Sequence, residues 1–143
     1  MAAILDEADS CAIAFAVGNE PYIVKLNFGY LWEGALPVLF FHCAREGRKL
    51  EMMRANPRVC FSLDSGHELV KGSDPCEWGM KYASIVGYGK LSEIEGGAER
   101  RSALNQVMRH YGWGGEGSYK EGPLGATCTL RLEVAEMSGK RRA

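Results

Sequence analysis

The chain has 143 residues, of which 46% are hydrophobic and 24% charged, as expected for one ordinary globular domain. Its 17 basic residues nearly balance its 18 acidic residues, so the formal net charge is −1. A protein that binds nucleic acid through the phosphates needs a basic surplus, and this composition therefore argues against a nucleic-acid partner.

The predicted elements, in chain order, are six strands and two helices. Alternating or wholly apolar runs predict strands at residues 12–17, 21–28, 38–42, 58–64, 81–94 and 127–134. Helical spacing of apolar residues predicts helices at 48–55 and 97–111, and the Asn-Pro pair at 56–57 ends the first. Residues 29–37 and 65–80 contain the Gly and Pro typical of loops. This order indicates one α+β, mainly β domain over residues 1–143, an antiparallel barrel with inserted helices.

Signals for membrane insertion, secretion and metal binding are weak. No apolar run approaches the roughly 20 residues of a membrane-spanning helix. Residues 1–10 contain three acidic and no basic side chains, whereas a signal peptide begins with positive charge. The five cysteines are scattered and form no CxxC pair, which disfavours a zinc knuckle and a thioredoxin-like redox pair. We therefore expect a cytoplasmic protein with reduced thiols and without a metal or a membrane partner.

Two stretches resemble phosphate-binding motifs. Residues 112–117 spell G-x-G-x-x-G, but a predicted helix precedes them and none follows, so we expect a simple loop. In the stretch 41–49, Arg48 and Lys49 open a helix after a glycine. A guanidinium, an ammonium and free helix amides suit a phosphate. The alternative is that both cations lie on the solvated face of a surface helix.

The histidines and aromatic residues leave alternatives open. His42 ends an apolar strand, where it is either a site residue or a packed core group. Aromatic residues fall in or near the predicted strands, where they suit a planar cofactor or, equally, a barrel core and a dimer face. The chain has no HExxH and no G-x-S-x-G, so nothing supports a metalloprotease or an α/β-hydrolase.

Four segments, occurring in order, carry a family resemblance. They are 21–30 (PYIVKLNFGY), 41–49 (FHCAREGRK), 56–61 (NPRVCF) and 78–90 (WGMKYASIVGYGK). Together they make the chain resemble the pyridoxamine 5′-phosphate oxidase-related flavoproteins, in particular the branch of the 5-nitroimidazole-resistance (Nim-type) proteins. The resemblance covers about residues 10–140 and includes the terminal SGK of 138–140. It implies a six-stranded split β-barrel that binds FMN and forms a homodimer with two flavins at the subunit interface.

In this family the turn between a strand and a helix holds the FMN phosphate. By position that role falls to Arg48 and Lys49, with His42 and Cys43 at the end of the preceding strand. Cys43 stands where a hydroxyl residue is common in the family. Because a thiol is a weaker hydrogen-bond donor than a hydroxyl, the resemblance implies weaker phosphate binding here.

Two further strands complete the site that the resemblance implies. The strand that meets the flavin ring and ribityl chain corresponds to Val24, Lys25, Leu26 and Asn27. Tyr82 and Ser84 correspond to the neighbouring wall. Lys25 replaces the proline that is usual in Nim-type proteins, which changes the backbone shape or the flavin electronics at this position.

The resemblance implies an FMN-dependent oxidoreductase that passes electrons from a reduced nicotinamide to a small molecule, such as a nitroaromatic. No catalytic residue is assigned, although Tyr82 and His42 are candidates for proton supply as well as for binding or packing. One alternative is a flavin-binding or storage module without turnover. Another is a cofactor-free structural protein, which has no reason to keep Arg48 and Lys49. A true pyridoxamine 5′-phosphate oxidase is disfavoured, because its longer terminal extensions have no room here.

Overall fold

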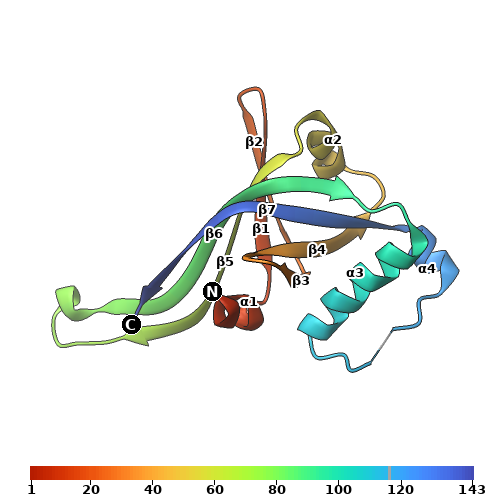
Figure 1. The fold of residues 1–143 in the computed structure, drawn as a ribbon. Helices are drawn as coiled ribbons and strands as arrows, with labels where there is room; N and C mark the ends of the chain where they lie inside the picture. The colour runs from red at the N-terminus through yellow and green to blue at the C-terminus, as the bar shows by residue number, and fades with distance from the viewer. Residues whose placement is uncertain (116) are drawn as a thin grey trace.

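One antiparallel sheet organises residues 1–115 and 117–143, the part of the chain that the computed structural model describes (Figure 1). Its seven strands are ordered β2-β1-β5-β6-β7-β4-β3. The strands are β1 Cys11–Val17, β2 Glu20–Leu26, β3 Phe28–Glu33, β4 Leu36–Ala44, β5 Arg58–Val70, β6 Gly79–Glu93 and β7 Thr127–Arg142. The helices are α1 Ala2–Glu7, α2 Arg48–Ala55, α3 Gly97–His110 and α4 Glu121–Gly125, with a 3₁₀ turn η1 at Pro75–Glu77.

The sheet has one strand more than the six predicted from the sequence. Residues 28–33 form β3 instead of leading into a loop, and only Asn27 separates β3 from β2. Strand β2 pairs with β1, whereas β3 pairs with β4, so one continuous segment supplies both edges of the sheet. The two edges therefore meet at Asn27, and the sheet has to curl into an open barrel.

Gly29, which looks like a strand breaker in the sequence, is where α3 crosses β3. A Cβ atom at this position would overlap the backbone of Gln106 and Val107. Because the obstacle is helix backbone, we expect Gly29→Ala to lower the free energy of unfolding by about 1–3 kcal/mol in urea titrations. Gly122→Ala is the matched control, since its Cβ would meet nothing within 4 Å. Equal stability of the two variants would contradict this close approach.

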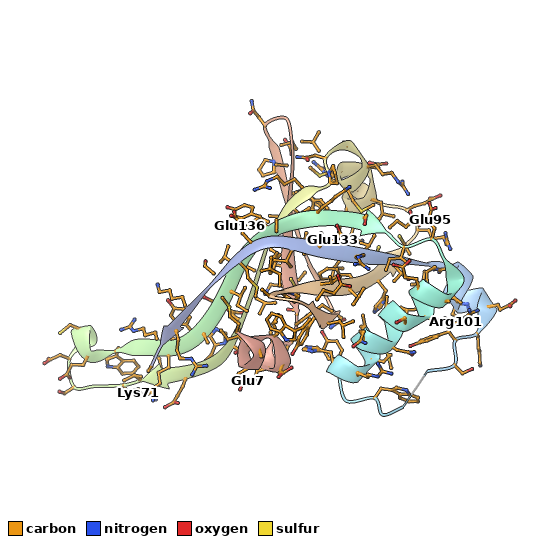
Figure 2. All side chains as sticks on the ribbon, viewed as in Figure 1. Glu7, Lys71, Glu95, Arg101, Glu133 and Glu136 are labelled. Atoms are coloured by element: carbon orange, nitrogen blue, oxygen red, sulfur yellow. The ribbon has the colours of Figure 1, made fainter. Side chains whose placement is uncertain are left out.

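Half of residues 65–80, expected to be a loop, extend two strands. Strand β5 continues to Val70 and β6 begins at Gly79, after a register shift between Ser65 and Glu68. Together with the end of β7 they project from the body as an arm, defined here as residues 66–82 and 140–142 (Figure 1). Lys71 marks its outer part (Figure 2). A projecting ribbon packs on no core, so its sequence lacks the apolar alternation that reveals a strand.

The core lies inside the curled sheet and is closed by helices. Leu39 and Phe41 of β4 face this core, as do residues of α1 and α2. Val38 and Phe40, on the other face of β4, pack against α3. Strand β4 is thus buried on both faces between β7 and β3, which confirms the interior position predicted from its apolar sequence. The helix predicted at 97–111 is confirmed as α3.

Two expectations from the sequence concern other parts of the chain. Helix α3 precedes the glycine-rich segment 112–117 as expected, while residue 116 within it lies outside the described residues. None of the helices in the described residues is long and apolar enough to cross a membrane.

Candidate functional site

Most of the predicted site residues border two strand edges that diverge from Asn27. Phe28–Phe41 is the last pair of the β3–β4 ladder, and residues 42–44 of β4 pair only with β7 in the described structure. Strand β2 likewise pairs only with β1. We call residues 22–27 of the β2 edge, 42–44 of the β4 edge and 47–49 at the start of α2 the split. Each edge leaves backbone N–H and C=O groups free to bind a ligand.

Arg48 and Lys49 lie at the start of α2 and reach opposite edges of the split. The Arg48 guanidinium lies 5.0 Å from the centre of the Tyr22 ring on β2, and its Nη2 is 3.2 Å from Glu20 Oε1. Lys49 lies beside Cys43 on β4: burial raises the pKa of the Cys43 thiol, and the Lys49 ammonium opposes this rise. The two cations thus bracket the helix start from both sides.

The start of α2 also offers backbone donors. Gly47 precedes the helix with φ of 141°, a conformation that favours glycine, and no side chain caps the helix. The amides of Leu50 and Glu51 donate to the Gly47 carbonyl, whereas those of Arg48 and Lys49 belong to the first turn, which has no such partner. Free amides, the positive end of the helix dipole and two cations form a corner that suits an anion.

Strand β2 places its side chains on alternating faces. Val24 and Leu26 are half-buried against the core, whereas Lys25 is exposed on the outer face. Lys25 therefore contributes its backbone, and not its side chain, to the split. The replacement of the usual proline by Lys25 therefore matters at the backbone, because lysine retains an N–H group that proline lacks.

Asn27 is held by Tyr111, a residue that the sequence did not single out. Asn27 Nδ2 and the Phe28 amide donate to the Tyr111 hydroxyl oxygen over 3.1 and 3.2 Å, and this hydroxyl donates to the Asp9 carbonyl over 2.7 Å. Tyr111 therefore fixes the junction where β2 becomes β3. In the sequence it is only the last residue of the helix predicted at 97–111.

His42 and Cys43 point to opposite faces of β4. His42 lines a pocket of about 360 Å³ between α3 and the segment before β7, together with Val107, Met108, Tyr119 and Lys120. Cys43 faces the core side and lies directly opposite Cys128 of β7. Only Cys43 therefore lies with Lys49, and His42 belongs to a separate, mainly apolar pocket. Tyr119 and Lys120 were missed because their segment has no periodic pattern.

Tyr82 and Ser84 lie far from the α2 corner in the same chain. Ser84 pairs with Lys140 of β7, whereas Cys43 pairs with Cys128. Twelve residues of β7 separate the two partners, on the order of 40 Å along an extended strand. Strands β1 and β5 also stand between β6 and β2. One protomer does not bring these two residues to the corner that holds Arg48 and Lys49.

The thiol opposite Cys43 makes stability depend on pH. Burial, with the nearby Cys43 and Glu93, raises the pKa of the Cys128 thiol from 9.0 to about 12. Between these two values the unfolded chain loses the proton more readily, so stability is full below about pH 9 and falls as the pH rises. We expect Cys128→Ala to make the decline in unfolding free energy from pH 9 to 11 shallower. An unchanged slope would contradict this assignment.

Comparisons with known proteins identify the family. A family model described as pyridoxamine 5′-phosphate oxidase matches residues 1–141, and the chain belongs to this family, as the sequence resemblance indicated. Its open antiparallel sheet is accordingly a split-barrel fold. No curated protein matches the chain.

Solved structures agree with this assignment. A proposed 5-nitroimidazole antibiotic resistance protein from Bacteroides thetaiotaomicron is 32% identical, with 96% of this chain and 80% of that chain covered and a TM-score of 0.80. An FAD-binding protein from Mesorhizobium loti is 24% identical, with 99% and 92% covered and a TM-score of 0.67. The flavocytochrome Anf3 from Azotobacter vinelandii is 19% identical, with 99% and 65% covered and a TM-score of 0.77. The last two show a shared fold.

Proposed function

We propose that this protein binds FMN in the split, with the phosphate at the start of α2. The observation that carries this proposal is the convergence of two unpaired strand edges on a corner with two cations and free helix amides. The family assignment and the flavin-binding proteins among the similar structures support it. Bound flavin would supply the redox chemistry.

The length of the β2 segment along the split suits an extended mononucleotide. From Tyr22, under the Arg48 guanidinium, to Asn27 the chain covers about 16 Å along β2, similar to the length of FMN. Arg48 would exchange Glu20 for the phosphate, Lys49 would bind it from the β4 side, and Cys43 would donate weakly. The free backbone edge of Val24–Leu26 would meet the polar edge of the flavin ring, and Asn27 would border it at the far end.

A homodimer is part of the proposal, since Tyr82 and Ser84 lie away from the corner of their own chain. The outer sheet face exposes Ile23, Val86 and Tyr88, and the arm exposes Trp78 and Met80. Large exposed apolar groups gathered on one face mark an interaction surface. In a dimer formed through this face, Tyr82 on the arm of one protomer and Ser84 just beyond the arm would reach the split of its partner.

For the reaction, we propose electron transfer from a reduced nicotinamide to a small acceptor such as a nitroaromatic. The 32% identity to the proposed nitroimidazole-resistance protein supports this acceptor class. The pocket beside His42 is largely apolar, of a size for a small ring, and His42 would supply a proton to the acceptor. The free cysteines support a cytoplasmic location.

The visible spectrum of the purified protein tests the cofactor. We expect a yellow protein with flavin bands that releases FMN, and not FAD, when it is denatured. A colourless protein that takes up no added FMN would refute the proposal. Turnover is then tested by oxidation of NADH or NADPH in the presence of a nitroaromatic. Bound FMN without turnover across several donors and acceptors would instead identify a flavin-binding or storage module.

A further inference from the structure

Two thiols near the α2 corner lie directly opposite one another. Cys43 on β4 and Cys128 on β7 are partners in the antiparallel register, and both cysteines are free. Directly opposite residues have Cα atoms about 4.5–5.5 Å apart, inside the range of about 4.4–6.8 Å found in disulfides. The Cys43 side chain is also among the causes that raise the pKa of the Cys128 thiol, as expected for neighbouring sulfurs.

The surroundings of the two thiols differ. Cys43 is half-buried: burial raises the pKa of its thiol, and the Lys49 ammonium opposes part of this rise. Cys128 is 1% exposed and keeps its proton, and the nearby Glu93 carboxylate, which pairs with Arg54 over 3.8 Å, adds to the rise in its pKa. Because Cys43 is the more exposed of the two thiols, a small oxidant reaches it first. The Glu93 carboxylate near Cys128 is a candidate acceptor for the Cys128 proton.

No other cysteine has such a partner in the described structure. Cys60 is paired with Ala14 and Tyr88, and Cys76 lies in η1 on the arm. Cys11 is buried and pairs with Leu26. Because a strand register fixes which side chains meet, the fold itself singles out Cys43 and Cys128 as a pair.

We propose that Cys43 and Cys128 are a redox-active pair that hydrogen peroxide converts to an intrachain disulfide between β4 and β7. The Cys43 sulfur attacks one peroxide oxygen and the O–O bond breaks; Cys43 becomes a sulfenic acid, and its former proton leaves in the first water. The Cys128 sulfur then attacks the sulfenic sulfur, the S–O bond breaks and the S–S bond forms. Glu93 takes the Cys128 proton and passes it to the departing hydroxide, which gives the second water. Two thiols are oxidised and one peroxide is reduced.

Peptide mapping tests this pair without depending on flavin. Cleavage after Lys and Arg places each of the five cysteines on a different peptide, with Cys43 in 26–45 and Cys128 in 121–131. After peroxide treatment of the folded protein, we expect these two peptides joined, with a combined mass lower by two hydrogen atoms and restored by dithiothreitol. The Cys60→Ser control should give the same product. Free Cys43 and Cys128 after treatment, or Cys43 joined mainly to another cysteine, would overturn the proposal.

Variants separate the two steps. In Cys128→Ser we expect oxidation to stop at Cys43, where dimedone traps the sulfenic acid, whereas Cys43→Ser should yield neither adduct nor cross-link. Should a serine variant fail to fold, Glu93→Gln keeps both thiols and is expected to slow cross-linking several-fold while sulfenic acid accumulates. An unchanged cross-linking rate in Glu93→Gln, together with an adduct on Cys128 instead of Cys43, would refute the assigned order of steps.

Discussion

Replacing Arg48 and Lys49 together by alanine is expected to weaken FMN binding by about 2–4 kcal/mol, roughly 30- to 800-fold in Kd. Each charge-assisted hydrogen bond to a phosphate contributes about 1.5–3 kcal/mol. The expected loss lies around the lower end of the sum for two such bonds, because Arg48 is half exposed and must give up Glu20. Quenching of flavin fluorescence on titration with apoprotein measures the change.

Three comparisons show whether the phosphate is the group that is recognised. Riboflavin has the same ring and no phosphate, so its affinity should not change in the double variant. Arg101→Ala removes an exposed cation on α3, away from α2, and should leave FMN affinity unaltered (Figure 2). Of the single variants, Lys49→Ala should lose more than Arg48→Ala, because Lys49 is half-buried and has no ion-pair partner within the described residues. Equal losses for FMN and riboflavin would refute the phosphate assignment.

Local sequence patterns were sufficient to predict an element where its buried residues follow the period of that element. The helix α3 and the interior strand β4 were predicted because their apolar residues follow the period of the element they form. Strand β3 was missed because Gly29 looks like a strand breaker. In the structure a glycine is needed at position 29 because α3 approaches the strand closely there. That contact joins residues far apart in sequence, so no local window contains it.

At the site, too, local features could be predicted from the sequence and long-range contacts could not. The cationic start of α2 is a local feature, and the structure places it beside both edges of the split. The grouping of His42 with Cys43 ignored strand alternation, which sends them to opposite faces of β4. Tyr111 was missed because its hydrogen bonds to Asn27 and Phe28 span 84 and 83 residues. Family position alone likewise did not reveal that Tyr82 lies on the projecting arm.

Phe61→Ala is expected to cost about 3–5 kcal/mol of unfolding free energy, the largest stability effect of any change considered. Phe61 is 1% exposed in β5, between Ile13 of β1 and Gly87 of β6. Its ring fills the space that a side chain at position 87 would need. Urea unfolding followed by circular dichroism measures the loss, which is a large share of the roughly 5–15 kcal/mol typical of whole domains.

Phe61→Leu is the control, because it keeps most of the buried volume and should cost much less than Phe61→Ala. Strand β5 also joins β1 and β2 to the rest of the sheet, so a destabilised β5 would also destabilise the β2 edge of the split. While Phe61→Ala remains folded without urea, its FMN affinity should stay close to that of the parent, since Phe61 faces the core and not the split. A small stability loss together with a large loss of FMN affinity would place the flavin on the core side of β5. That result would contradict binding along the free edge of β2.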